Sequence, residues 1–331
     1  MGNTNSFLLS RTDSIGDMIL TLPMAGLLKK IHPGCKVIIL GKNYTRSVVE
    51  CAQHVDSFLD IDTLPIHPKA CAEFLNALGI TDVIHVFPVK QVAFQLARTG
   101  KRRIGTVNRW YHWLTCNQLI QLSRKNSPYH EAQLNALLLK KSGLIEMPSL
   151  EALAGLISLQ APSIDELTAV YLSTDRTNVI LHPKSKGSAK EWGLKNYAEL
   201  AAMLPENKFN VMVCGTAEEG KLIGNTFESI PAVKNLTGKF SLIQYMALIE
   251  KADALIAAST GPLHIAAAFG KTAIGLFSEK RPIHPGRWAP LGKNAIVVSD
   301  KNCKRCQQGK DCDCVSRISP QTILNLLNER F

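Results

Sequence analysis

Short apolar runs alternate with helical patterns along this chain, and the alternation occurs twice. Strands that are apolar on both faces and separated by helices are typical of parallel sheets covered by helices on both sides. We therefore expect two α/β domains, each with a doubly wound parallel sheet. The expected strands are Phe7–Leu9, Val37–Leu40, Ser57–Leu59, Val83–Phe87 and Arg102–Thr106, then Val179–Leu181, Val211–Cys214, Ala254–Ala257 and Ala273–Phe277.

Length agrees with two domains, because 331 residues suit two cores of about 150 residues each. The stretch Glu146–Asn178 contains Pro148 and Pro162 and has no clear strand, so it is the expected hinge. We place one domain at residues 1–165 and the other at 166–331. The expected helices are Met18–Ile31, Lys69–Leu78, Leu194–Leu204, Ala217–Glu228, Leu242–Ala252, Leu263–Phe269 and Pro320–Arg330. The last of these helices can pack on either domain, so it can return to the first.

Charge and apolar content restrict the partners and the compartment. Lysine and arginine exceed the acids by 38 − 27 = +11, which favours anionic partners. No apolar run reaches the roughly 18–20 residues of a membrane span, and the first residues lack the basic-then-apolar pattern of a signal peptide. An odd number of cysteines, nine, in a long chain does not resemble a secreted disulfide scaffold. We expect a cytoplasmic protein.

The segment Arg11–Pro23 follows the first expected strand and opens the first helix, where doubly wound folds bind ligands. Gly16 permits a tight turn, and Asp17 then falls in the first turn of the helix. The alternative is that Asp13 or Asp17 only caps this helix.

Two further segments occupy comparable positions in the second half. His182–Trp192 carries three lysines, two serines and a glycine directly after a strand, which predicts a phosphate cradle; the alternative is a solvated surface loop. In Ala257–Ala268, Ser259 or Thr260 can cap a helix whose first turn accepts Pro262, leaving backbone amides for a diphosphate. The alternative there is a plain strand–turn–helix connection.

These segments resemble glycosyltransferase family 9, the ADP-heptose:lipopolysaccharide heptosyltransferases. The resemblance rests on Gly16-Asp17…Thr21…Pro23, on Lys190-x-Trp192, on Thr260–His264 and on Arg287–Gly292, in the family's order. It implies a GT-B arrangement of two Rossmann-like domains facing a central cleft, with the acceptor on the first and the nucleotide sugar on the second. It also implies an inverting mechanism that requires no metal or other cofactor for catalysis.

The resemblance assigns roles to particular residues. Asp17 matches the catalytic base. Lys190 and the amides of residues 260–263 would stabilise the departing diphosphate. The stretch Arg287–Gly292 falls where the family holds the nucleotide base. Ser259 stands where many members carry an aspartate, so the donor stays open between ADP-heptose and another nucleotide sugar, or the chain is a non-catalytic binding protein. The implied donor-binding residues are Ser185, Gly187, Ser188, Trp192, Ser259, Thr260, Gly261, Pro262, Leu263 and His264.

Residues 83–130 contain no acid, eight lysines and arginines, and interleaved aromatic residues. One interpretation is a surface for an anionic glycolipid or glycan acceptor, with peripheral contact at the inner face of the inner membrane. The other is a solvated basic face with the aromatics in the core. Nucleic acid is not expected as a partner, because it would leave the three segments without a purpose. The candidate acceptor-binding residues are Asp13, Arg98, Lys101 and Arg103.

Four cysteines crowd into twelve residues, with the spacing Cys303-x2-Cys306-x5-Cys312-x-Cys314. Four thiols this close predict a structural zinc or iron site, although the C-x-C half is tighter than the usual zinc spacing. Disulfides or free thiols are the alternatives. We expect the cluster to be a local staple away from catalysis.

Overall fold

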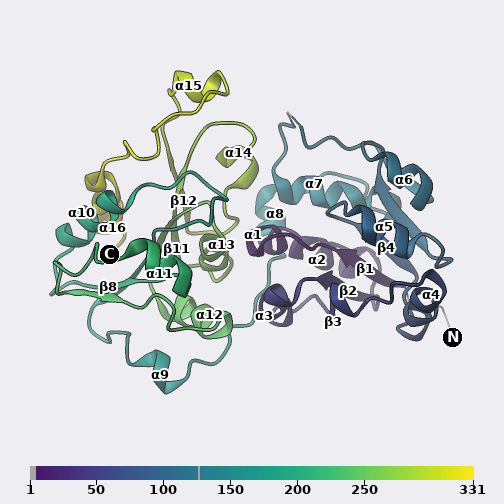
Figure 1. Cartoon of the computed structure of the whole chain (residues 1–331), viewed down its shortest axis with the longest axis horizontal. Coiled ribbons are helices and arrows are strands. Elements are labelled where there is room, and N and C mark those ends of the chain that lie inside the picture. The colour runs from purple at the N-terminus through teal and green to yellow at the C-terminus, as the bar shows by residue number, and fades with distance from the viewer. Residues whose placement is uncertain (1–4, 126) are drawn as a thin grey trace. The chain divides into compact units, whose positions relative to one another are not determined.

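A computed structural model describes residues 5–125 and 127–331 (Figure 1). It divides the chain into two compact units, which meet in sequence between Gln160 and Ala161. This boundary falls inside the proline-containing stretch 146–178. None of the helices in the described residues is long and apolar enough to cross a membrane.

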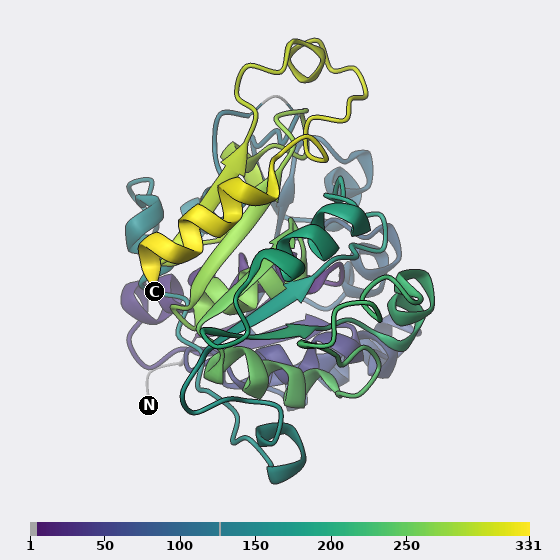
Figure 2. The same ribbon diagram turned by 90° about the vertical axis from the view of Figure 1, so that its left-hand side faces the viewer.

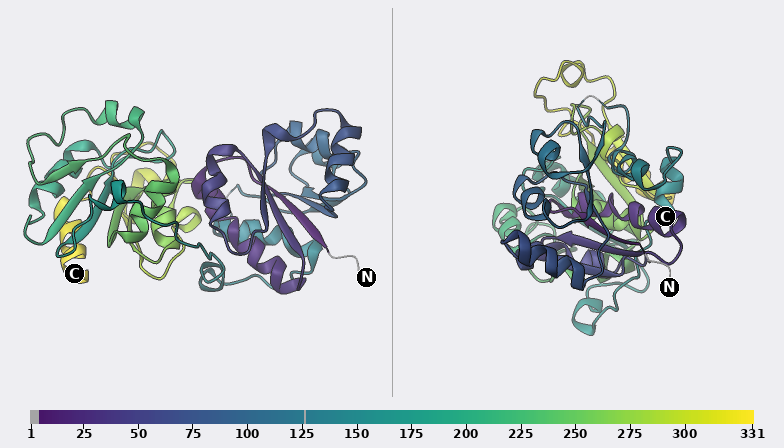
Figure 3. Two further views of the ribbon diagram at one scale, coloured as in Figure 1. Left: turned by 90° about the horizontal axis from the view of Figure 1, so that it is seen from below. Right: turned by 90° about the vertical axis from the view of Figure 1, so that its right-hand side faces the viewer.

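The first unit is built on a six-stranded sheet in the order β3-β2-β1-β4-β5-β6, with every neighbouring pair parallel. Helices lie on both sides of it (Figure 3, left). Its strands are β1 (Ser6–Ser10), β2 (Lys36–Gly41), β3 (Ser57–Asp60), β4 (Asp82–His85), β5 (Arg102–Thr106) and β6 (Gln118–Ile120). Its helices are α1 (Ile15–Ile19), α2 (Leu22–Ile31), α3 (Arg46–Glu50), α4 (Pro68–Ala77), α5 (Lys90–Leu96), α6 (Trp110–Thr115), α7 (Glu131–Leu137) and α8 (Leu150–Ala154), with short 3-10 turns η1 (Asn43–Thr45), η2 (Ile61–Thr63) and η3 (Leu138–Ser142).

The second unit repeats this topology with the order β12-β11-β10-β7-β8-β9, again all parallel. Its strands are β7 (Thr177–His182), β8 (Phe209–Val213), β9 (Val233–Asn235), β10 (Ala254–Ala258), β11 (Thr272–Phe277) and β12 (Ala295–Ser299). Its helices are α9 (Glu166–Ala169), α10 (Leu194–Met203), α11 (Ala217–Ile223), α12 (Leu242–Lys251), α13 (Gly261–Ala268), α14 (Pro285–Trp288), α15 (Lys304–Gln307) and α16 (Pro320–Arg330). The predicted fold class of two doubly wound parallel domains is therefore confirmed.

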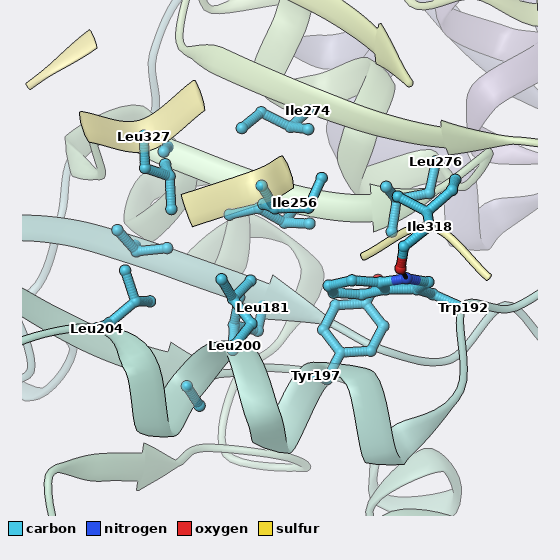
Figure 4. Close-up of a cluster of buried hydrophobic side chains, with 14 of the residues drawn as sticks. Leu181, Trp192, Tyr197, Leu200, Leu204, Ile256, Ile274, Leu276, Ile318 and Leu327 are labelled. Atoms are coloured by element: carbon cyan, nitrogen blue, oxygen red, sulfur yellow. Dashed lines mark hydrogen bonds between the residues drawn. The ribbon is translucent and has the colours of Figure 1, made fainter. Parts of the chain in front are cut away.

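The core of the second unit lies between its sheet and the helices α10 and α16 (Figure 4). Leu181 and Ile256 from the strands are fully buried, and so are Ile323 and Leu327 from α16. The last helix, α16, was expected to pack on either domain, and it packs on the second unit. It runs beside α10 (Figure 2).

Two helices differ from their predicted bounds for identifiable backbone reasons. The single helix expected over 18–31 is two helices, because the chain breaks at Leu20 and Thr21 and restarts with Pro23 in the first turn of α2. The helix expected over 217–228 ends at Ile223, since Gly224 takes a φ of 52° that a right-handed helix cannot continue through.

Candidate functional site

The strand order reverses direction once in each unit, between β1 and β4 and between β7 and β10. Doubly wound sheets bind ligands beyond the carboxyl ends of the strands at this switch point. Residues 11–17 follow β1, residues 183–192 follow β7, and residues 259–264 follow β10. All three predicted segments therefore lie at a switch point.

Asp17 lies in the first turn of α1, but Ser14 is the residue that caps the helix. The Ser14 hydroxyl accepts from the backbone N–H of Asp17 at 3.4 Å and donates to Asp17 Oδ2 at 2.5 Å. The cap is thus Ser14 and neither aspartate, while Asp17 stands in the first turn, where its charge complements the helix dipole. The Asp17 side chain is 16% exposed, with Oδ1 paired to Arg11 and Oδ2 accepting from Ser14.

A buried arginine holds this carboxylate in place. Arg11, whose side chain is 1% exposed, forms ion pairs with Asp17 and with Asp13, the latter over 2.6 Å between Nε and Oδ1. Burial raises the pKa of Asp13 to about 6, a rise that Arg11 opposes and the neighbouring Asp17 charge reinforces. Asp13 and Asp17 therefore share one guanidinium.

Helix α7 supplies a second layer beneath this group. Glu131 accepts from Arg11 Nη1 at 3.3 Å and from Arg124 Nε at 3.0 Å. Asn135, one turn further on, accepts from both arginines and donates to the carbonyl of Leu20 at 3.1 Å. These residues were not predicted; their only local signal is that Glu131 and Asn135 are four apart and share a helix face.

The predicted acceptor-side cations do not gather around Asp17. Lys101 and Arg103 lie at the amino end of β5, beside the start of β4, whereas Asp13 and Asp17 follow the carboxyl end of β1. The structure also uses them internally, since Lys101 Nζ donates to Asn76 Oδ1 at 2.5 Å and Arg103 Nε donates to the carbonyl of Thr115 at 2.8 Å. Arg98 is exposed just beyond the end of α5. The acceptor role predicted for these three residues therefore lacks support from their positions.

Other members of the basic stretch do follow the carboxyl ends of strands. Lys90 begins α5 after β4, and Arg109 precedes α6 after β5; both are exposed. Lys90 Nζ lies 5.0 Å from the centre of the Trp110 ring, a cation–π distance. Trp110, Trp113 and Leu114 on α6 are 61%, 63% and 70% exposed. The interpretation that the aromatics of this stretch belong to the core fails for both tryptophans, although Tyr111 is buried.

The lysine-rich segment after β7 is an ordered turn. Ser185 donates its backbone N–H and its hydroxyl to Glu191 Oε1 at 2.9 and 3.1 Å. Lys184 Nζ pairs with the other Glu191 oxygen at 2.5 Å, and the Ser188 hydroxyl donates to the carbonyl of Ser185 at 2.8 Å. Gly187 is exposed at the apex with a φ of 79°. The turn is thus internally bonded through Ser185, although residues 186–188 are exposed, so both the phosphate cradle and the solvated surface loop stay open.

Trp192 closes the segment from beneath instead of lining its surface. The side chain is fully buried, packs edge-on against Tyr197 at 4.9 Å between ring centres, and donates from Nε1 to the carbonyl of Ile318 at 2.8 Å (Figure 4). A fully buried ring offers no surface to a ligand, so the predicted donor contact of Trp192 becomes a supporting role.

Helix α13 begins directly after β10, with Thr260 as its cap residue and Pro262 in its first turn. Ser259, Gly261 and Pro262 are partly exposed, whereas Leu263 and His264 are buried. Thr260 is only 7% exposed, and within the described residues its hydroxyl has no hydrogen-bond partner. A buried, unpartnered hydroxyl at a helix N-terminus is suited to an anionic ligand.

The fourth motif packs on this helix. Gly292 lies so close to α13 that a Cβ there would be 2.2 Å from the carbonyl oxygen of Ala267. Arg287 and Trp288 belong to α14, with the guanidinium carbon 4.7 Å from the centre of the indole ring. Gly292 therefore packs on α13 near its carboxyl end, at Ala267.

The four clustered cysteines meet at one point in the second unit. Their sulfur atoms all lie within 4.8 Å of one another, with Cys306 Sγ 3.1 Å from Cys312 Sγ and 3.5 Å from Cys314 Sγ. None of the nine cysteines forms a disulfide in the described residues. Tetrahedral thiolate sites need four sulfurs about this close, so the set fits a zinc or iron ion.

The cluster is not remote from the segment after β7. Cys303, Cys306 and Cys314 belong to the same buried cluster as Trp192. Lys190, whose side chain is 35% exposed, places its Nζ 2.8 Å from Oδ2 of Asp311, the residue before Cys312. This hydrogen bond raises the pKa of Lys190. The cysteine segment thus contacts the segment after β7, while its expected distance from catalysis stays a prediction.

Comparison with known families finds a match to glycosyltransferase family 9 (heptosyltransferase) over residues 122–314. A protein of Haemophilus influenzae, provisionally described as a glycosyltransferase, is 26% identical over 86% of this chain and 85% of its own length. The lipopolysaccharide core heptosyltransferase OpsX of the same organism is 29% identical over 41% of this chain. That alignment spans only 40% of OpsX.

Solved structures of similar fold include heptosyltransferases. The ADP-heptose LPS heptosyltransferase II of Escherichia coli has a TM-score of 0.76 and 20% identity, covering 98% of both chains. TibC of enterotoxigenic Escherichia coli, described as an iron-containing dodecameric glycosyltransferase, has a TM-score of 0.51 and 14% identity over 98% of this chain and 76% of that one. The fold is thus the two-domain GT-B fold.

Proposed function

Because the chain belongs to glycosyltransferase family 9, the heptosyltransferase family, we propose that it is an inverting transferase that moves a heptose from ADP-heptose onto a lipopolysaccharide core or related glycan. The observation that carries this proposal is the partly exposed Asp17 carboxylate, fixed beyond β1 by the buried Arg11. A base of this kind needs a fixed position and access for the acceptor; Arg11 and Ser14 hold the Asp17 carboxylate, and its side chain is 16% exposed.

In the proposed reaction, Asp17 takes the proton of the acceptor hydroxyl while that oxygen bonds to the anomeric carbon of the donor. The bond from the anomeric carbon to the diphosphate breaks, through an oxocarbenium-like transition state, and ADP leaves. Lys190 and the amides at the start of α13 stabilise the negative charge that grows on the diphosphate. Charge neutralisation is supplied by these groups, so the reaction requires no metal.

Ser259 bears on the donor sugar, because it stands where many family members carry an aspartate. A serine hydroxyl hydrogen-bonds to a sugar without a charge. A thermal-shift panel of nucleotide sugars tests the donor: ADP-heptose should raise the melting temperature, and a rise only with uridine or guanosine donors would reject the heptose. Binding without transfer or hydrolysis of any donor would favour a non-catalytic binding protein.

For the acceptor side, we assign the exposed face of α6 and its flanks to an anionic glycolipid at the inner face of the cytoplasmic membrane. Trp110 and Trp113 are amphipathic rings suited to the membrane interface, and Lys90 and Arg109 supply positive charge beside them. Sedimentation with anionic lipid vesicles measures this contact. Changing both tryptophans to serine should abolish it and leave donor binding unchanged.

For the cysteine cluster, we propose a structural zinc or iron ion held by Cys303, Cys306, Cys312 and Cys314. Four sulfurs within 4.8 Å, three of them buried, are the supporting observation. The ion would supply cross-links within residues 303–314 and take no part in the transfer. Metal analysis of protein purified without chelators is expected to give one ion per chain, and a metal-free protein with four alkylatable thiols would reject the site.

Asp17→Asn tests the reaction itself. The amide keeps the shape of the side chain but cannot accept the proton, so transfer should fall at least a thousandfold while ADP binding is retained. Asp62→Asn is the control, since Asp62 is an exposed carboxylate in η2. Full activity in Asp17→Asn would remove Asp17 as the base.

A further inference from the structure

One carboxylate in the cysteine segment bridges two lysines from different loops. Asp311 Oδ2 lies 2.8 Å from Lys190 Nζ, in the loop after β7, and Asp311 Oδ1 lies 3.3 Å from Lys280 Nζ, in the loop after β11. Each oxygen therefore takes one ammonium group. The two lysines are 90 residues apart in sequence, so this bridge brings their charges together beside the segment after β7.

The backbone on either side of this bridge is anchored at the cysteine cluster. Asp311 directly precedes Cys312, and its carbonyl accepts from Arg305 Nε at 2.8 Å, next to Cys306. On the other side, the Ser278 hydroxyl accepts from the backbone N–H of Lys280 at 3.2 Å and lies 3.4 Å from Cys306 Sγ. The carboxylate and one of its lysines are thus fixed to the same group of thiols.

The bridge has little value for stability. The Asp311 side chain is 69% exposed, and the side chains of Lys190 and Lys280 are 35% and 27% exposed. Exposed ion pairs contribute between zero and about 1 kcal/mol. What such a bridge does provide is position, because it fixes two flexible ammonium groups in one place. Each ammonium carries three N–H donors, so a lysine bonded to Asp311 still has donors for a phosphate.

Resting on the proposed function, in which Lys190 faces the donor diphosphate, we propose that Asp311 is a positioning residue for transfer. It holds Lys190 and Lys280 together as a preformed pair of cations for the diphosphate. The segment of residues 303–314 is then a support of the donor site that reaches it through one carboxylate. Lys280, which the sequence motifs do not include, becomes the second diphosphate cation.

Asp311→Asn tests this assignment, with Asp313→Asn as the matched control. Asp313 lies in the same loop between Cys312 and Cys314, is 66% exposed and pairs with Arg317 over 3.4 Å, so its change removes the same charge without touching either lysine. Because the cations act on charge that grows in the transition state, Asp311→Asn should lower kcat about tenfold and change the donor KM less. Asp311→Glu should restore part of the rate, and Asp313→Asn should match the unmodified protein.

A second readout does not depend on activity. The acetylation rate of each lysine, mapped by mass spectrometry, should rise severalfold at Lys190 and Lys280 in Asp311→Asn, and Lys221, which pairs with Glu218, serves as the internal reference. Unchanged acetylation at Lys190 and Lys280, or faster acetylation with an unchanged kcat, would overturn the positioning role. Absence of transfer in the unmodified protein would instead reject the proposed function, while the acetylation rates would still decide whether Asp311 holds the lysines.

Discussion

His85 should make the first unit sensitive to mild acid, and this sensitivity has a calculable size. The side chain is fully buried at the end of β4, and within the described residues neither ring nitrogen has a hydrogen-bond partner. Burial, reinforced by the nearby His112 and Arg103, lowers the pKa of His85 to about 3. The His112 ring centre is 5.4 Å away. The folded protein therefore keeps His85 neutral where the unfolded chain protonates it.

The sign follows from proton binding. Below the unfolded-state pKa of about 6.5, the unfolded chain binds one more proton than the folded protein at His85, so the free energy of unfolding falls as the pH falls towards 3. With a folded-state pKa of about 3, the loss between pH 7 and pH 5 is about 2 kcal/mol. Well above the unfolded-state pKa of about 6.5, His85 is neutral in both states and takes nothing from the free energy of unfolding.

His85→Leu removes the titrating group at nearly constant volume and leaves no buried nitrogen unpaired. The variant should match the unmodified protein within about 1 kcal/mol at pH 7. The free energy of unfolding of the variant minus that of the unmodified protein should be about 2 kcal/mol larger at pH 5 than at pH 7. Urea unfolding at both pH values measures the difference. His67→Leu changes an exposed histidine and should keep the original pH dependence. Parallel pH dependence in His85→Leu and the unmodified protein would refute the reasoning.

Three other substitutions test the described contacts. Arg11→Met leaves the carboxylates of Asp13, Asp17 and Glu131 without their buried cation, so the free energy of unfolding should fall by about 3–5 kcal/mol. An unchanged free energy of unfolding, measured by thermal unfolding, would contradict the ion-pair assignment. Thr260→Val removes an unpartnered buried hydroxyl, so stability should change by less than about 1 kcal/mol while calorimetry shows several-fold weaker ADP binding; equal affinity would separate Thr260 from the phosphate. Gly292→Ala would drive a Cβ into the Ala267 carbonyl and should cost about 2 kcal/mol or more, whereas Gly155→Ala, which meets no atom closer than 3.6 Å, should be nearly neutral in the same melting assay.

Most central strands of both sheets were predictable, because they are buried on both faces and contain a continuous apolar run; β5 (Arg102–Thr106), which begins with two arginines, lacks such a run but was also expected. The three strands that were missed, β6 (Gln118–Ile120), β9 (Val233–Asn235) and β12 (Ala295–Ser299), are all sheet edges with one neighbour. Lys234 in β9 and Gln118 in β6 interrupt the apolar pattern, whereas β12 does contain the apolar run Ala295–Val298 but is only partly buried, with Val297 exposed.

The residues of the candidate site divide in the same way. Asp17 and Thr260 could be found because each stands in a local motif after a strand. Arg11 with Glu131, and Lys190 with Asp311, are partners separated by 120 and 121 residues, and no local spacing announces such a pair. The positions of Lys101 and Arg103 could not be predicted for a related reason. A basic stretch shows its charge in the sequence, but only the course of the strands decides whether that charge lies at their amino or their carboxyl ends.

The repeated strand order has a consequence for how this chain divides its chemistry. At equivalent points of one topology, the loop after β1 presents two carboxylates on a buried arginine, and the loop after β7 presents lysines on a buried tryptophan. The scaffold is indifferent to the sign of the charge that it carries there. The loop after β1 is thus acidic and the loop after β7 is basic, and about a dozen residues in each unit set this difference. These two loops are therefore the natural segments to exchange between members of the family when chimaeras are made.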